Sequence, residues 1–324
     1  MKELTRDLVI SAFLGLMLPG MLLNFASAVW DRAVYTQNVE ILAEEPAYST
    51  PVKIRSGEGT VTQGHMEEYL VGVVLAEMPA SFEEEALKAQ SIVARTYARK
   101  ACRTGGKHGD GSICTDSGCC QAYITEEDYL LQGGTPEHVE KIRTAVDATS
   151  GLVLTYEDNL IEATYFSCSG GSTEDAVAVW GTDFPYLQAV ESPGEEQALH
   201  YQDIAEFTPR QLEEKLGILL SGSPTAWVSA ISYTNGGGVD SIAIGGVFFS
   251  GTEIRRKLGL RSTAFSVESR RDGVTFTTKG FGHRVGMSQY GADAMAVAGS
   301  DYMQILAHYY QGTELKQIGE NTPW

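Results

Sequence analysis

One apolar helical segment with a single acidic residue places the strongest constraint on how this chain can fold. The segment runs from Tyr69 to Pro79 and reads Tyr-Leu-Val-Gly-Val-Val-Leu-Ala-Glu-Met-Pro. We expect a helix that ends at Pro79, because proline removes a backbone donor, and that buries one face in the core of the domain. At a period of 3.6 residues that face carries Met66, Leu70, Val73, Val74 and Glu77.

Glu77 occupies a position on this face that packing alone would fill with leucine or isoleucine. Burial disfavours the charged form of a carboxyl and raises its pKa, and a protonated carboxyl is what a general acid needs. The alternative is a half-exposed glutamate at a frayed helix end, paired with a basic neighbour as most buried acids are. Glu77 is therefore the first candidate catalytic residue.

The composition is that of a packed globular protein, and the net charge narrows the classes of partner. The 324 residues are 43% apolar and 9% aromatic, enough for one large domain or two ordinary ones. With a formal net charge of −18, the long-range electrostatic force between this chain and nucleic acid or an anionic membrane surface is repulsive. We therefore expect no nucleic-acid partner and a neutral or weakly charged ligand.

The N-terminal segment contains a run of 21 residues without a charge, from Leu8 to Ala28, long enough to cross a bilayer as a helix. The run exceeds the usual ~7–15 apolar residues of a signal-peptide core, so we predict that residues 1–30 form an uncleaved transmembrane anchor. A cleaved signal segment is the alternative, since Ala26-Ser27-Ala28 fits a small-residue cleavage site. Either way, the residues that follow are expected to lie outside the cytoplasm.

The rest of the chain is predicted to divide into a stalk and one folded region. Residues 31–60 include the stretch Ala-Glu-Glu-Pro-Ala-Tyr-Ser-Thr-Pro, which is too broken by proline for a helix and indicates an extended stalk. Residues 61–324 are predicted to form a single α+β domain, because helical patterns come first and last and strand patterns lie between them. We expect its helices to pack on a twisted, largely antiparallel sheet.

The five cysteines are an odd number for a chain facing an oxidising space, so they cannot all pair internally. Thiolates and imidazole suit zinc, and a glycine-rich loop carries His108, Cys114 and Cys120 at steps of six residues. The fourth position is left to water, to Cys119 or to a remote group. The alternative is a set of disulfides such as Cys114–Cys120 or Cys102–Cys168.

Six short motifs follow one another along the chain, and their order is more specific than any one of them. They are Tyr69-Leu-x-Gly72, Glu77-Met-Pro79, Glu85-Ala-Leu-Lys-Ala-Gln90, Ala94-Arg-Thr-Tyr97, Ser167-Cys-Ser-Gly-Gly-x-Thr173 and Gly282-His-x-Val-Gly-Met-Ser-Gln-x-Gly-Ala292. Together they resemble the stage II sporulation protein D family of membrane-anchored lytic transglycosylases. The resemblance spans roughly residues 66–312 and includes the N-terminal anchor.

The resemblance implies that the chain cleaves peptidoglycan glycan strands, stripped of their stem peptides, while the mother-cell membrane engulfs the forespore. It implies a single-pass protein of the cell membrane with an extracytoplasmic catalytic domain, and a sporulation wall amidase and membrane proteins of the engulfment complex as partners. Family members place their catalytic glutamate where Glu77 stands. Zinc-binding members use a histidine and two cysteines at the spacing of His108, Cys114 and Cys120, and we expect such a zinc ion to be structural.

Transglycosylase chemistry explains why one carboxyl suffices. Ordinary glycosidases use two acidic residues, whereas here the nucleophile comes from the substrate. Protonated Glu77 would donate to the oxygen between N-acetylmuramic acid and N-acetylglucosamine. As a carboxylate it would then take the proton of the muramic C6 hydroxyl while that oxygen closes on C1, which gives a 1,6-anhydro end. Intramolecular attack favours a dry setting for the acid.

Several polar residues in or near the motifs are candidates for binding the sugars. Glu85, on the second helix, is the alternative to Glu77 as the acid. Arg284 stands where many relatives carry glycine, and it is a candidate cation for the muramic lactyl carboxylate. Structural ion pairing, core packing or a tight turn is the alternative for the binding candidates, which are Arg95, Tyr97, Ser169, Thr173, His283, Ser288 and Gln289.

Two other functions are compatible with the sequence. A non-catalytic wall-binding module, like the amidase enhancers that share the domain, predicts glycan binding without cleavage. A zinc hydrolase predicts water-derived products and loss of the chemical step on chelation.

Overall fold

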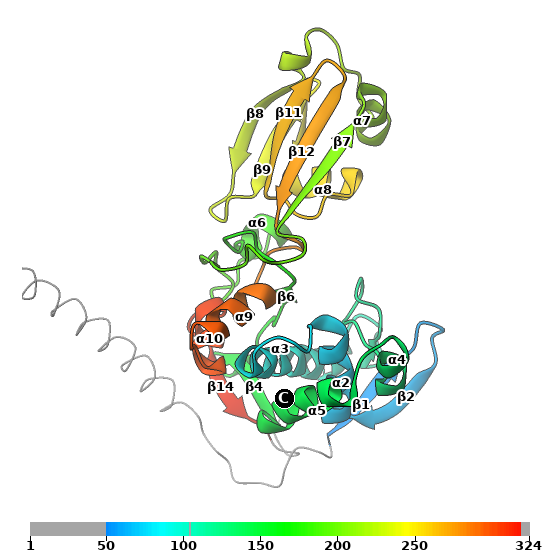
Figure 1. Cartoon of the computed structure of the whole chain (residues 1–324), viewed down its shortest axis with the longest axis vertical. Helices are drawn as coiled ribbons and strands as arrows, with labels where there is room; N and C mark the ends of the chain where they lie inside the picture. Colours follow the sequence, from blue (N-terminus) through cyan, green and yellow to red (C-terminus); the bar gives the residue numbers. More distant parts are fainter. Residues whose placement is uncertain (1–49, 104, 319–324) are drawn as a thin grey trace, which may run out of the picture.

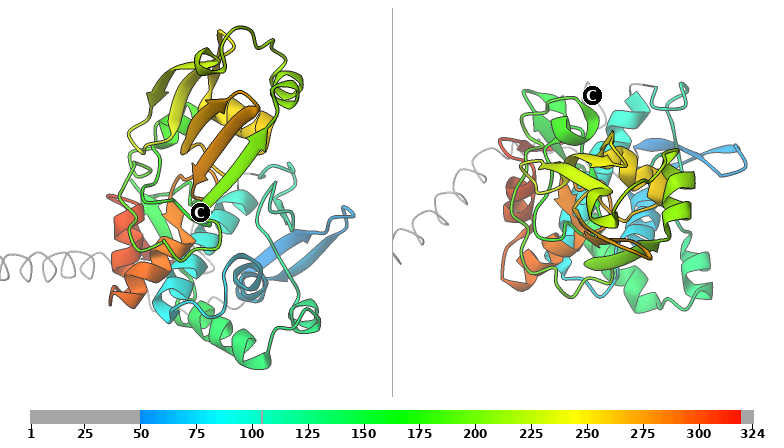
Figure 2. Two further views of the ribbon diagram at one scale, coloured as in Figure 1. Left: turned by 45° about the horizontal axis from the view of Figure 1, so that its top comes forward. Right: turned by 90° about the horizontal axis from the view of Figure 1, so that it is seen from above.

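The computed structural model describes residues 50–103 and 105–318, which form two lobes with separate hydrophobic cores (Figure 1). The lower lobe combines residues before 202 with residues after 279. The upper lobe is the stretch between them, and it is inserted into the lower lobe as one continuous segment. In the left view of Figure 2 the upper lobe again stands apart from the helices of the lower one.

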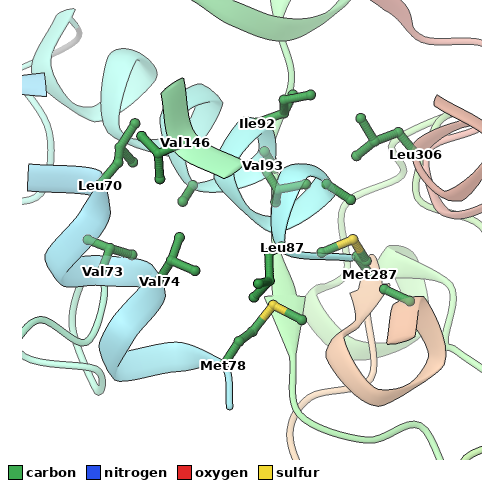
Figure 3. Close-up of a cluster of buried hydrophobic side chains, with 14 of the residues drawn as sticks. Leu70, Val73, Val74, Met78, Leu87, Ile92, Val93, Val146, Met287 and Leu306 are labelled. Carbon is green, nitrogen blue, oxygen red and sulfur yellow. The ribbon is translucent and has the colours of Figure 1, made fainter. Parts of the chain in front are cut away.

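The lower lobe is built around one long helix, α3 (Glu84–Arg103), which contacts four other helices. Its alanine-rich surface lets these neighbours approach closely. Figure 3 shows the core they share, with Leu70, Val73 and Val74 facing Leu87 and Val93 across the interface between α2 and α3. The four neighbours are α2 (Met66–Glu77), α5 (Pro136–Ala148), α9 (Gln289–Val297) and α10 (Tyr302–Tyr309).

Three small sheets surround these helices. Strands β1 (Pro51–Arg55), β2 (Val61–His65) and β3 (Ser112–Cys114) form one, and their hairpin projects from the side of the lobe (Figure 2). A second has the order β14-β4-β5, and β6 pairs in parallel with β13. Their bounds are β4 (Leu152–Tyr156), β5 (Asn159–Leu160), β6 (Tyr165–Phe166), β13 (Met287–Ser288) and β14 (Glu314–Gln317), and two short helices complete the lobe, α4 (Glu126–Leu131) and α6 (Ala176–Trp180).

The upper lobe consists of two antiparallel three-stranded sheets and two short helices around a core of its own. Phe276, Phe265 and Ile242 are among the buried side chains of this core. One sheet has the order β11-β12-β7 and the other β10-β9-β8. The elements are β7 (Gln202–Phe207), α7 (Pro209–Leu216), the 3-10 turn η2 (Pro224–Ala226), β8 (Val228–Tyr233), β9 (Val239–Ile244), β10 (Val247–Ser250), α8 (Gly251–Leu258), β11 (Phe265–Arg270) and β12 (Gly273–Lys279).

The prediction of an α+β protein with mainly antiparallel strand pairing is confirmed, but its other parts need correction. Within residues 50–103 and 105–318 the strands form five small sheets instead of one, and there are two large hydrophobic cores instead of one. Residues 51–55 belong to β1, so the end of the predicted stalk, residues 31–60, is part of the folded lower lobe. The predicted anchor, residues 1–30, lies outside the described residues, and within residues 50–318 no helix has the length and apolar character to cross a bilayer.

Arg284 fastens the two lobes to each other. It adopts a φ of 67° and is 2% exposed. Its guanidinium donates to the carbonyl of Ser172, 2.6 Å away, and to that of Gly236 in the upper lobe, 2.7 Å away. It also pairs with buried Glu174, which accepts the N–H of Gly238. The predicted role of Arg284 as a cation for substrate is thus corrected: all its donors face protein.

A second buried arginine holds the lower lobe together. Arg95 on α3 pairs with Glu67 in the first turn of α2, with 2.6 Å between Nη2 and Oε2, and both side chains are almost completely buried. The remaining donors of Arg95 reach the carbonyls of Val146 and Leu152. One guanidinium therefore links α2, α3, the end of α5 and the start of β4.

This pair generates a stability prediction. Replacing Arg95 by methionine leaves the buried Glu67 carboxylate without a charged partner and with only the N–H of Gly151 as a donor, so we expect a loss of about 3–5 kcal/mol in the unfolding free energy of the lower lobe, measured by denaturant unfolding. The double variant Arg95→Met/Glu67→Leu should lose less than Arg95→Met alone, because no unpaired charge remains. Arg210→Met, in an exposed pair with Glu214, is the control and should unfold like the wild type. Equal losses in the single and double variants would contradict this account.

Candidate active site

Glu77 lines a pocket of about 640 Å³ in the lower lobe. The pocket lies between the end of α2, the cysteine-containing loop, β6, α6 and the loop that returns from the upper lobe. Its wall contains one carboxyl group among the described residues, that of Glu77. The lining residues are Glu77, Tyr97, Lys107, Ser117, Gly118, Cys119, Cys120, Gln121, Ala163, Thr164, Tyr165, Phe166, Ser167, Trp180, Phe281, Gly282 and His283.

The carboxyl of Glu77 is held by three donors from distant parts of the chain. Glu77 is the last residue of α2 and is half-buried. Its Oε1 accepts the backbone N–H of Ala122 at 2.9 Å and the hydroxyl of Tyr165 at 3.3 Å. Its Oε2 accepts the side-chain amide of Gln289 at 3.4 Å. The acid is therefore fixed in direction even though it stands at a helix end.

Two opposing effects set the protonation state of Glu77. Burial is the larger one and raises the pKa of its carboxyl above the ordinary value for glutamate. The hydrogen bonds from Ala122, Gln289 and Tyr165 stabilise the carboxylate and lower the pKa in part. The carboxyl thus combines burial that favours its acid form with donors for the carboxylate that remains after proton transfer, which suits a group that gives and then takes a proton.

A chain of hydrogen bonds supports Tyr165 behind Glu77. The hydroxyl of Tyr69 donates to Oε1 of Gln121, and Nε2 of Gln121 donates to the hydroxyl of Tyr165 at 3.0 Å. Tyr165 is therefore left to donate its own proton to Glu77. Sequence analysis missed Gln121, Ala122 and Tyr165; the available signal was that Gln121 and Ala122 directly follow Cys120.

Aromatic rings form the wall next to His283. The ring of His283 lies between those of Phe166 and Trp180, with centroids 5.6 and 5.3 Å away. Its Nδ1 accepts the N–H of Val285, and burial together with the nearby charge of Arg255 lowers the pKa of His283 to about 4. His283 is thus neutral at neutral pH. Trp180, also missed from the sequence, stays 41% exposed and lines the pocket.

The structure brings four potential metal ligands together beside this pocket. The ligand atoms of His108, Cys114, Cys119 and Cys120 all lie within 4.8 Å of one another. Nε2 of His108 is 3.9 Å from Sγ of Cys119 and 3.7 Å from Sγ of Cys120. Three thiolates and one imidazole fit zinc in number and chemistry, and the two separations from His108 are close to the roughly 3.6–3.8 Å edges of a tetrahedral zinc site. All five cysteines are among the described residues, and none forms a disulfide.

The predicted sugar-binding residues divide into those at the pocket and those buried elsewhere in the protein. Tyr97 and His283 line the pocket, and Gln289 reaches Glu77 from its edge. Ser288 is buried and caps α9 by accepting the N–H of Gly291. Glu85, the alternative acid, pairs with Lys88 away from the pocket lining.

Three further predicted binding residues are buried, like Ser288, and lie outside the lining of the pocket. Arg95 is enclosed by its ion pair with Glu67. Ser169 is fully buried, and its N–H and hydroxyl both donate to Oε2 of Glu195. Thr173 is 1% exposed and accepts the N–H of Val190. The alternative readings of ion pairing and a structural turn hold for these residues.

Comparison with known proteins identifies the family. The sequence pattern of the stage II sporulation protein family matches residues 55–156. The chain is 38% identical over 286 residues to the stage II sporulation protein D of Bacillus amyloliquefaciens, covering 87% of this chain and 83% of that protein. The chain belongs to the stage II sporulation protein D family.

Two further relatives frame this assignment. Identity to the stage II sporulation protein D of Bacillus subtilis strain 168 is 39% over 280 residues, covering 84% of this chain and 81% of the relative. Identity to the amidase enhancer of the same organism is 31% over 304 residues, covering 76% of this chain but 40% of that longer protein. The match to the sporulation proteins thus extends well beyond α2 and α3 and includes both lobes.

The donors around Glu77 generate a prediction for this member of the sporulation family. Tyr165→Phe removes a donor to the carboxylate, so the pKa of Glu77 should rise further above the wild-type value. The measurement is a pH titration of the Glu77 side-chain carboxyl by 13C NMR. Tyr233→Phe, in the upper lobe and exposed, is the matched control and should leave the titration unchanged. A lower pKa in Tyr165→Phe would show that Tyr165 does not stabilise the carboxylate.

Proposed function

We propose that this chain is a lytic transglycosylase that cuts peptide-stripped peptidoglycan between N-acetylmuramic acid and N-acetylglucosamine. One observation carries the proposal: within the described part of the chain, Glu77 is the sole carboxyl in the wall of its pocket. Glycosidases that use a nucleophile or activate water need a second acidic residue about 5–10 Å from the first. A reaction that takes its nucleophile from the substrate needs one.

The surroundings of Glu77 match the two halves of this reaction. Burial favours the protonated form, which donates to the glycosidic oxygen as the bond to C1 breaks. The donors Ala122, Gln289 and Tyr165 then stabilise the carboxylate. The carboxylate accepts the proton of the C6 hydroxyl while the oxygen of that hydroxyl bonds to C1. No water enters the balance, and the product ends in a 1,6-anhydro ring. The partly exposed ring of Trp180 lines the pocket and is a group on which a sugar ring can stack.

We further propose zinc as a structural ion held by His108, Cys114, Cys119 and Cys120. When bound, the ion would supply rigidity to the loop that carries Gln121 and Ala122 to Glu77. The proposed proton transfers involve the chain's own carboxyl alone.

The biological setting is inferred from the relatives and from the N-terminal sequence. The stage II sporulation names of the relatives support a role in sporulation, and the uncharged run from Leu8 to Ala28 supports anchoring in the cell membrane. We propose that the protein is anchored in the mother-cell membrane that engulfs the forespore and that its catalytic domain lies outside the cytoplasm. A wall amidase that strips the peptides and membrane proteins of the engulfment complex would be its partners.

The decisive test of the function is the product of Glu77→Gln. We expect wild-type protein to release fragments with 1,6-anhydro-muramic ends from peptide-stripped glycan, detected by mass spectrometry. Glu77→Gln should slow their release by at least about 10²–10⁴-fold, the usual contribution of a general acid and base. Glu85→Gln is the matched control and should retain activity. Water-derived reducing ends as the wild-type product would refute the mechanism.

The 31% identity to an amidase enhancer keeps a second candidate, a non-catalytic wall-binding protein. In the same experiment that candidate predicts that wild type and Glu77→Gln both bind glycan and that neither releases products.

The metal proposal has its own test. Purified protein should contain one zinc ion per chain by elemental analysis, and a chelator should lower the melting temperature. Cys119→Ser should weaken zinc binding, whereas Cys102→Ser, outside the four-residue cluster, should leave it unchanged. A protein that contains no zinc and melts at the same temperature with and without added zinc would refute the proposal.

A further inference from the structure

A second cavity lies next to the Glu77 pocket and has no part in the chemistry described so far. Its volume is about 720 Å³, within the range of roughly 300–1,000 Å³ that is common for ligand sites. We call it the tyrosine cavity. It is lined by Leu75, Ala76, Thr115, Tyr123, Ile124, Thr125, Asp128, Tyr129, Gln132, Gly133, Gly134 and His138.

The tyrosine cavity and the Glu77 pocket are walled by the same two backbone segments. At the end of α2, Ala76 lines the cavity and the next residue, Glu77, lines the pocket. In the following loop, Gln121 lines the pocket and Tyr123 lines the cavity. The amino acids that line this second hollow are therefore close neighbours in the chain of those around Glu77, so a polymer whose reacting bond lies at Glu77 can extend towards it.

The two tyrosine rings of the cavity are fixed in place. The Tyr123 ring stacks on that of Tyr69 at 5.6 Å, over Gly72, where a Cβ would come within 2.4 Å of the Tyr123 ring. The Tyr129 ring lies against Gly134, where a Cβ would come within 2.2 Å of it, and its hydroxyl is 3.2 Å from Nδ1 of His138. Both side chains are only half-buried. Fixed aromatic faces that remain open to a ligand lose little conformational entropy on binding.

The charges around the cavity indicate which ligand it takes. Among the described residues that line it there is no lysine or arginine, and Asp128 supplies a carboxylate. The nearby Arg143 is engaged by Glu68 and Glu126. An anionic group such as a lactyl carboxylate therefore has no lysine or arginine to pair with here. A neutral sugar can stack on the rings and hydrogen-bond to Asp128, Gln132 and the backbone of the Gly133-Gly134 turn.

We infer that the tyrosine cavity is a distal subsite for a neutral N-acetylhexosamine of the same glycan strand that occupies the Glu77 pocket. This inference rests on the proposed function, because it takes the ligand to be a glycan. The subsite binds a sugar of the strand beyond the two that flank the reacting bond, so it contributes to long strands and not to a disaccharide. It gives the protein a preference for polymer over fragments without a further catalytic group.

The experiment measures affinity as a function of glycan length in the background of Glu77→Gln, so that nothing is cut. Peptide-free glycan oligosaccharides of two to eight sugars are titrated into the protein by calorimetry. Tyr129→Ala should weaken binding of the octasaccharide by about tenfold and leave that of the disaccharide unchanged. Tyr129→Phe, which keeps the ring, and Leu131→Ala, exposed on the same helix and outside the cavity, should bind all lengths like the parent.

Several outcomes separate the subsite from the proposed function. The subsite is wrong if Tyr129→Ala, with an unchanged melting temperature, binds the octasaccharide as tightly as the parent, or loses equal affinity for every length. The transglycosylase proposal alone is wrong if the length effect is observed but wild-type protein makes no anhydro products. Absence of glycan binding by the parent at any length overturns both.

Discussion

The buried ion pair between Glu67 and Arg95 is the interaction on which the geometry of the lower lobe depends. It joins the first turn of α2 to the middle of α3 and, through two backbone carbonyls, to the ends of α5 and β4. Two charges taken out of water must be matched almost completely, so the pair tolerates one arrangement of these elements. Because α2 is one continuous helix of 12 residues, fixing its start also fixes where its last residue, Glu77, emerges.

At that emerging end, burial and hydrogen bonding act on Glu77 in opposite directions. Apolar surroundings favour the neutral acid, and donors from three other segments favour the anion. A carboxyl balanced in this way can serve both halves of a reaction in which a proton is given and another is taken. A deeper position would lock the acid in its protonated form, and a fully exposed one would leave it an ordinary surface carboxylate.

The sequence was a good guide to elements and a poor guide to the surroundings of polar residues. The apolar stripe with one acid, the motif order and the spacing of His108, Cys114 and Cys120 led to α2, the family and three of the four clustered ligands. Arg95, Ser169 and Thr173 were misassigned because a polar residue in a motif reads the same whether it faces a ligand or a buried carboxylate. Tyr165 and Trp180 were missed because their partners lie far away in the chain. The upper lobe was not recognised because no linker-like composition marks its ends.

Those ends have a simple geometric property. The chain leaves the lower lobe at Tyr201 and returns at Gly280, and these two residues are joined by a backbone hydrogen bond of 2.8 Å, directly beside the paired residues Gln202 and Lys279. If the upper lobe were removed, Tyr201 and Gly280 would have to be joined across a gap no wider than the distance between two paired strands. An ancestor could gain, lose or exchange the whole upper lobe at this seam as a cassette, while the pocket around Glu77 kept most of its walls.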